Sequence, residues 1–438
     1  MASMRPLVIA AGVALGLSSV ARADDASTTQ DLAAQVKALQ AKVASLEGQS
    51  AANRADVSAT IDSVLKDADA RSKSMALSGG MAGYDDTKGF VIQSANGDFL
   101  LHPYLQMQAR YAANYTRHGK ADGNDTTDDG FELRRMKLGF DGTVFGNIDY
   151  RFQWATNRHT GLVSLEDGWA KLPIADQLSL RVGQFKDPFA HESLTSSMKQ
   201  LAVERSYLGA IFAFDDNYVQ GVSLVWDGGA FHGELAYTDG EQSNNTNFQS
   251  NNGDPTITGP NFGVAGRLDY KVFGDWKSYD DFTALGNAHD LLVIGGGFDF
   301  TQTGRQDVIR HTVDAQWETG PLALYGSYLA RYIVNSPNGD SYDPGVLVQA
   351  GYMLNNQWEV FGRYDLIHFD KKTAPGTLRN VHELTAGVNY YVHKHNVKVT
   401  VDATWLPKGA PVADDLGDIL KNDSKNEIVF RAQLQLFI

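Results

Sequence analysis

The chain has 438 residues, of which 43% are hydrophobic and none is Cys, and its formal net charge at pH 7 is −14. The acidic balance argues against a nucleic-acid partner, and the absence of Cys excludes a disulfide scaffold and a thiol site. No apolar run reaches the roughly 20 residues that a membrane helix needs, which excludes a helical membrane protein. A transmembrane β-barrel stays open, because its strands alternate apolar and polar residues.

The N-terminus has the three parts of a secretory signal. Arg5 supplies a positive charge, residues 7–20 are apolar, and Ala21-Arg22-Ala23 forms a small-residue cleavage site. We therefore predict a signal peptide over residues 1–23 and export of the mature chain. The alternative is a short buried helix.

Residues 24–76 are predicted to form a coiled-coil helix in the periplasm. The apolar residues are spaced 4-3-4-3 at Leu32, Val36, Leu39, Val43 and Leu46, which is typical of a coiled-coil seam. A seam this narrow on a polar helix is not stable alone, so it implies partner chains. The alternative is a lone helix packed on the rest of the protein. Residues 77–98 are predicted to be a Gly-containing linker.

From Phe99 to the C-terminus the chain reads as sixteen alternating strands. They start near Phe99, Phe131, Asn147, Val163, Gln177, Tyr218, Ala230, Asn261, His289, Asp307, Leu322, Val346, Trp358, His382, Asn396 and Glu427. Tight turns alternate with longer polar loops, as in outer-membrane barrels. The prediction is an all-β protein, a 16-stranded antiparallel transmembrane β-barrel over residues 99–438. A soluble β-sandwich is the alternative, but sixteen strands with apolar and aromatic outer faces exceed one sandwich.

One loop, residues 186–216, is predicted to fold into the barrel and narrow it. Pro188 ends the preceding strand because it cannot donate to a ladder. About 30 residues without strand alternation follow, and a structureless insert of that length is often functional.

Cations on one strand parity are the candidate solute-binding residues. An anion filter needs cations held where the local dielectric is low, and Arg suits oxyanions because its fork donates paired hydrogen bonds. With the apolar set facing lipid, five cations of the first five strands should form one basic wall: Arg110, Arg135, Lys137, Arg151 and Arg181. The loop adds Lys186, Lys199 and Arg205. The alternative for any one of them is a structural salt bridge.

Acidic residues share the same interior. Glu204-Arg205 is expected to tie the loop to the wall rather than to touch solute. Later strands pair charges of opposite sign on their inner faces, and we expect these pairs to neutralise each other and stiffen the wall: Arg267 with Asp269, Arg310 with Asp314, Arg363 with Asp365, and Lys398 with Asp402.

Four stretches make the chain resemble the phosphate-selective porin O and P family. They are FELRRMKLGFDGTVFGNIDYRF (131–152), LSLRVGQFKDPF (178–189), ESLTSS (192–197) and ERS (204–206). The resemblance implies a trimer of 16-stranded barrels with one pore each, an inward-folded third loop, and channels that often favour anions, phosphate among them.

The sequence thus predicts an outer-membrane porin, not an enzyme, that passively conducts small hydrophilic solutes with a bias toward anions such as phosphate. Expected partners are these solutes, outer-membrane lipid and two further copies of the chain; no cofactor or metal is expected. Two alternatives stay open: a general non-selective diffusion porin, and a structural tether whose coiled coil contacts the cell wall.

Overall fold

The computed structural model describes residues 34, 37–45, 48, 63 and 66, and then residues 80–438 except 86–88, 118–123, 215–216, 246–259, 287–289, 305, 375–377, 411–419 and 421–424. The chain divides into two compact units, Met1–Ser78 and Gly79–Ile438. The described residues of the first unit are helical, while the predicted signal peptide lies outside the described residues. No helix in the described part of the chain is long and apolar enough to cross a membrane.

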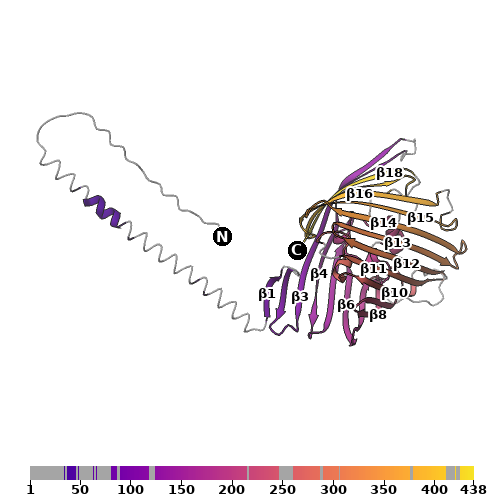
Figure 1. Ribbon diagram of the computed structural model, residues 1–438, viewed down its shortest axis with the longest axis horizontal. Coiled ribbons are helices and arrows are strands. Elements are labelled where there is room, and N and C mark those ends of the chain that lie inside the picture. The colour runs from indigo at the N-terminus through magenta and orange to yellow at the C-terminus, as the bar shows by residue number, and fades with distance from the viewer. Residues whose placement is uncertain are drawn as a thin grey trace. The chain divides into compact units, whose positions relative to one another are not determined.

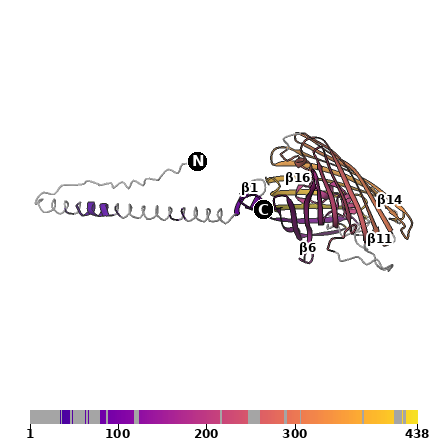
Figure 2. The same ribbon diagram turned by 90° about the horizontal axis from the view of Figure 1, so that it is seen from below.

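The second unit is a closed β-barrel (Figures 1 and 2). Each strand from β3 onward pairs antiparallel with the next, and β18 pairs with β3. This closure leaves no unpaired edge, which a barrel in lipid requires. Within the described residues the barrel strands number sixteen, as predicted.

The first eight barrel strands are β3 (Leu100–Thr116), β4 (Thr126–Val144), β5 (Ile148–Thr156), β6 (Val163–Ala175), β7 (Leu178–Lys186), β8 (Tyr218–Gly228), β9 (Phe231–Thr238) and β10 (Pro260–Phe273). The other eight are β11 (Leu291–Thr303), β12 (Gln306–Thr319), β13 (Leu322–Val334), β14 (Ser341–Met353), β15 (Trp358–His368), β16 (Asn380–His393), β17 (Val397–Leu406) and β18 (Glu427–Phe437).

Two strands begin earlier than the sequence indicates. β4 starts at Thr126 rather than near Phe131, and β14 at Ser341 rather than near Val346. The extra residues of β4 pair with the last residues of β3, up to Thr116 with Thr126. Backbone pairing therefore continues through polar stretches, where no apolar side chains mark the alternation.

Part of the predicted linker is a hairpin instead. β1 (Gly80–Asp85) and β2 (Gly89–Ser94) pair with each other along their whole length. Two residues of β2 also pair with β3, Ile92 with Leu101 and Gln93 with Leu100. The hairpin thus belongs to the barrel unit.

The segment between β7 and β8, which we call the inward loop (residues 187–217), contains three short helices: α2 (His191–Leu194), η1 (Ser197–Lys199) and α3 (Tyr207–Ala213). Nearly all of its described residues are buried. Phe189, Leu208 and Phe212 of the loop share a core with Leu347 and Ile367, which lie on the inner faces of β14 and β15. The loop therefore occupies the interior of the barrel.

The outer face tests the membrane assignment. Val313 lies at the centre of β12 and is 58% exposed. We expect Val313→Arg to lower the free energy of unfolding from bilayers by about 2–4 kcal/mol, because a cation at the bilayer midplane is costly. The measurement is a denaturant titration in lipid, and Val313→Leu, which stays apolar, should match the wild type.

Candidate functional site

The wall of the barrel supplies hydrogen bonds that the inward loop cannot make for itself. The first N–H groups of a helix have no partner within it, and two of them in α3 donate to wall carboxylates: Tyr207 N to Glu383 Oε2 and Leu208 N to Asp365 Oδ2, both at 2.8 Å. Asp402 accepts from Val203 N at 2.9 Å. These carboxylates bind the backbone of the inward loop.

Cations of the later strands donate hydrogen bonds to backbone carbonyl groups of the same loop. Arg363 Nη1 donates to Glu204 O at 2.8 Å, and Arg310 Nη1 donates to Phe212 O at 3.1 Å. Lys398 Nζ donates to Met198 O and Gln200 O, both at 3.0 Å. Burying the loop backbone would cost free energy if these groups lacked partners.

Three of the four expected ion pairs on the later strands are therefore wrong in their partners. Arg267 does bind Asp269, at 2.7 Å, and it binds Asp314 at the same distance. The other three cations pair differently: Arg310 with Asp299 and Glu241, Arg363 with Glu383, and Lys398 with loop carbonyls, while Asp402 pairs with Arg431. Strand alternation placed the charges inside correctly, but register and the loop decide which groups meet.

Four of the predicted site residues line one cavity beside the inward loop. This loop-level cavity has a volume of about 220 Å³, and its basic lining is Lys137, Arg151, Arg181 and Lys186. The remaining lining residues come from β3, β5, β6 and β8 and from the loop: Gln106, Gln153, Asp167, Trp169, Leu194, Ser196, Ser197 and Tyr218. The cavity lies against β3–β8, whereas the loop packs on β13–β17.

Each cation of the loop-level cavity has a partner. Lys137 Nζ lies 2.7 Å from Glu166, and Arg151 Nη2 lies 3.1 Å from Asp141. Arg181 binds Glu234, and Lys186 donates to a loop carbonyl. Counting Asp167, four carboxylates accompany the four cations, so the cavity is rich in charge of both signs. The Arg151 side chain is 41% exposed and is the most accessible of the paired cations.

A second cavity lies nearer the end of the barrel where most turns are short. This mouth cavity, about 770 Å³, is lined by Tyr84 and Phe90 of the hairpin, by residues of β3–β6, and by residues at the ends of β16–β18 such as His393, Val397 and Phe437. Arg151 and Trp169 line both cavities. The two cavities are therefore neighbours along β5 and β6.

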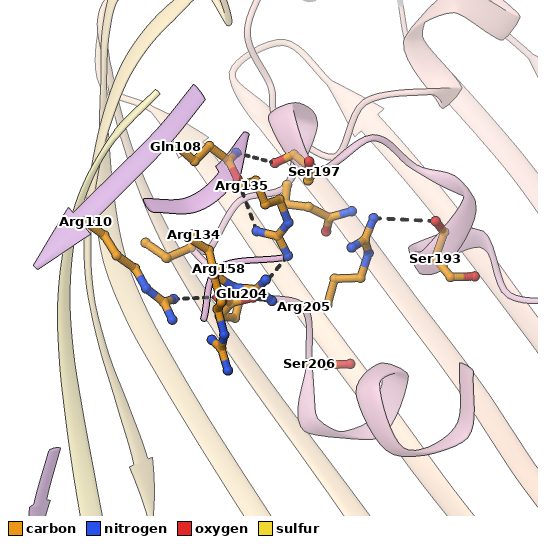
Figure 3. Close-up of polar contacts among 12 residues, drawn as sticks. Gln108, Arg110, Arg134, Arg135, Arg158, Ser193, Ser197, Glu204, Arg205 and Ser206 are labelled. Atoms are coloured by element: carbon orange, nitrogen blue, oxygen red, sulfur yellow. Dashed lines mark hydrogen bonds and ion pairs between the residues drawn. The ribbon is translucent and has the colours of Figure 1, made fainter. Parts of the chain in front are cut away.

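Arg110 and Arg135 lie outside the loop-level cavity. Together with Arg134 they surround the carboxylate of Glu204 in the inward loop, an arrangement that we call the Glu204 clamp (Figure 3). Arg134 Nη2 and Arg135 Nη2 lie 3.0 and 3.2 Å from Glu204 Oε2. Glu132 also binds Arg110 and lies 3.6 Å from Arg158. The clamp joins the loop to β3 and β4.

The clamp controls the ionisation of Glu204. Burial would raise the pKa of this carboxyl, but Arg134, Arg135 and Arg110 outweigh burial and hold the pKa well below its usual range. Glu204 is therefore ionised at any physiological pH, and it attaches the loop to the wall.

The two remaining predicted residues are also not in the cavity. Arg205 is buried and donates to backbone carbonyls of its own loop, Glu192 O at 2.9 Å and Thr195 O at 2.8 Å. Figure 3 shows its contact with a third loop residue, Ser193. Lys199 ends the short helix η1, and its carbonyl accepts from Phe282 N at 3.2 Å. Because the loop turns back on itself, these positions could not be assigned from strand parity.

Sequence reasoning missed Arg134 and Glu166 because each is the extra residue of a β-bulge. Gln108 pairs with Arg135 and Ala109 with Leu133, so Arg134 has no partner in the ladder, and Glu166 is left over in the same way between β5 and β6. A bulge puts two consecutive side chains on one face. The signal was present: outward apolar residues shift from odd to even numbers between Leu133 and Leu138.

No group of three or more His, Cys, Asp or Glu that could hold a metal ion occurs among the described residues.

Residues 105–436 match the family described as "Phosphate-selective porin O and P". The chain belongs to this family. A curated protein of Aquifex aeolicus (strain VF5), described as uncharacterized, is 23% identical over 316 residues, which cover 67% of this chain and 72% of that protein.

Solved porins have the same fold. The anion-selective porin from Comamonas acidovorans superposes with a TM-score of 0.56 at 13% identity, covering 77% of this chain and 99% of that one. Pseudomonas putida OprB gives 0.52 at 10% identity, covering 76% and 94%, and Salmonella typhi OmpF gives 0.51 at 13%, covering 81% and 100%. Family and fold together identify this porin as an outer-membrane channel.

The clamp predicts a defect in loop position. In Glu204→Gln three arginines would face one another without their carboxylate, at a cost on the order of a few kcal/mol. We expect a less fixed loop and higher open-channel noise in single-channel recordings. Asp227→Asn, which changes an exposed carboxylate at the end of β8 away from the clamp, is the matched control; equal noise in both variants would contradict the role of the clamp.

The clamp also predicts resistance to acid. The pKa of Glu204 is lower in the folded protein than in the unfolded chain, where it is about 4. Ionised Glu204 therefore stabilises the folded state fully above about pH 4, and this stabilisation is lost only when the pH falls below the pKa of the folded state. Noise in the wild type should therefore not change between pH 7 and about pH 4. A rise in noise within this window that Glu204→Gln lacks would show that the clamp titrates there.

Proposed function

We propose that this porin passively conducts small hydrophilic solutes across the outer membrane, with a bias toward anions and without a catalytic step. The observation that carries the proposal is the loop-level cavity, where Lys137, Arg151, Arg181 and Lys186 converge beside the inward loop. A cation held near a narrow, partly desolvated passage attracts anions more strongly than one in bulk water.

The carboxylates of the cavity limit this bias. Glu166, Asp141 and Glu234 each bind one of the cations, so a passing anion meets cations that are already partly neutralised. We therefore propose weak anion preference. Phosphate is one candidate solute, supported by the description of the family, and the anion selectivity stated for the Comamonas acidovorans porin supports the same direction.

We further propose that three copies assemble through residues 24–76 in the periplasm after removal of residues 1–23. Leu39 and Val43, two residues of the predicted seam, are 62% and 51% exposed in the single chain. Burying such side chains against partner helices is favourable. Residues 24–76 also support the second candidate function, a tether to the cell wall. If this segment is a tether, its deletion should detach the envelope layers while the conductance stays unchanged.

The deciding experiment is the reversal potential of single channels across a KCl gradient, with phosphate then added. The proposal is supported if the reversal potential shows that anions permeate more readily than cations and if added phosphate blocks the chloride current. A reversal potential on the cation side would overturn the anion bias while leaving the porin intact, and a value near zero would indicate a general diffusion porin.

The same measurement on a double variant assigns the residues. We expect Arg181→Gln with Lys186→Gln to move the reversal potential toward the cation side, because two of the four cations are removed and Glu234 loses its partner. The matched control removes two exposed loop cations, Arg117→Gln with Lys371→Gln, and should leave the potential near that of the wild type. Equal shifts in both pairs would mean that overall charge, not the cavity, sets the preference.

A further inference from the structure

The turn between β10 and β11, which we call the long turn (residues 274–290), is unlike the others at its end of the barrel. The other strand connections there are short, for example 176–177, 229–230 and 320–321. The long turn contains α4 (Trp276–Tyr279), and Tyr279, Phe282, Thr283 and Ala284 are almost completely buried. A turn exposed to water would not bury these side chains, so the segment folds into the barrel.

Wall groups far from β10 hold the long turn in place. Gln316 of β12 donates to Asp281 O at 2.6 Å, and Glu359 of β15 accepts from Ala284 N at 3.0 Å. His395, in the turn after β16, lies 2.7 Å from the Asp281 carboxylate. Burial would raise the pKa of Asp281, but His395, the Thr283 N–H group and Lys199 together outweigh burial and lower the pKa. The long turn thus spans the interior from β10 to the turn after β16.

The long turn meets the inward loop inside the barrel. The rings of Tyr279 and His191 are stacked, with centroids 3.9 Å apart and planes 5° from parallel. The Phe282 ring lies edge-on to His191 at 5.1 Å, and Phe282 N donates to Lys199 O at 3.2 Å. Burial lowers the pKa of His191, so this ring is neutral and packs against the two aromatic rings. The two segments enter from opposite ends of the barrel.

Both segments fill the same half of the interior. Phe282 belongs to the apolar core that joins the inward loop to β13–β17, and the loop-level cavity lies on the other side, against β3–β8. The position of the inward loop sets how much of that side is open. The loop is attached to β3 and β4 by the Glu204 clamp and contacts the long turn through Phe282 and Tyr279.

We propose that the long turn is a strut that positions the inward loop and thereby sets the width of the passage for solutes. Phe282 and Tyr279 are its positioning residues. The proposal rests on the proposed function, because a width matters only if solutes pass; the attachment itself can be tested without any current.

The test uses the full-length protein in planar bilayers and two alterations of the strut. Phe282→Ala removes the ring between His191 and Tyr325, whose centroid lies 4.6 Å from that of Phe282. In the second variant, residues 274–290 are replaced by Asn-Gly, which leaves a two-residue turn between Phe273 and Leu291. Phe145→Ala is the matched control, since Phe145 is an exposed aromatic residue in a short turn at the same end and contacts Phe99.

We expect both strut variants to show noisier open channels, a conductance raised roughly two-fold as the passage widens, and entry of larger neutral polymers, while Phe145→Ala behaves as the wild type. Heat-modifiable migration on gels reports whether each barrel is folded. Unchanged noise, conductance and polymer cut-off in a folded strut variant would overturn the proposal.

A second measurement separates this inference from the proposed function. The chain has no Cys, so Met198→Cys in the inward loop and Thr160→Cys in the loop after β5 give two unique spin-label sites. We expect a narrow distance distribution in the otherwise wild-type chain and a broad one with Phe282→Ala. A distribution that stays narrow would overturn the strut even in a conducting channel, and broadening would support it even if the wild type passed no current.

Discussion

The structure depends on one constraint: a loop folded inside a barrel must find partners for its buried backbone groups. The inward loop cannot satisfy the start of α3 by itself, and Glu383 and Asp365 of the wall accept those N–H groups. Arg363, Arg310 and Lys398 donate to its carbonyls. Leaving a buried polar group unpaired costs more free energy than a typical hydrogen bond contributes. These wall charges therefore hold the loop in place.

This attachment divides the interior into two functional halves. On the side of β13–β17 the charges and the apolar core hold the loop. On the side of β3–β8, Lys137, Arg151, Arg181 and Lys186 are gathered around open space. The Glu204 clamp lies between the two halves and fixes the loop to β3 and β4. A barrel whose interior holds many charges can therefore offer only a few of them to a passing ion.

Two β-bulges change which charges face the interior. The bulge of β4 turns Arg134 inward beside Arg135, where both bind Glu204, and the bulge of β6 turns Glu166 inward beside Asp167. Glu166 then binds Lys137 at 2.7 Å. One register irregularity thus adds a cation to the loop attachment, and the other adds a carboxylate beside Lys137 of the cavity, where it would temper the proposed preference for anions.

The sequence alone determined the barrel, its sixteen strands, the inward loop and the inward orientation of those site residues that lie on strands, because each follows from local alternation and its interruption. It also showed the phase shift at Leu133 and Leu138 that marks the bulge. Only the tertiary structure decided which charges meet: Arg110 and Arg135 bind Glu204, which is distant in sequence, and Arg205 turns back to its own loop. Ion pairing depends on strand register and on the path of a loop without periodicity, and neither is encoded in a repeating local pattern.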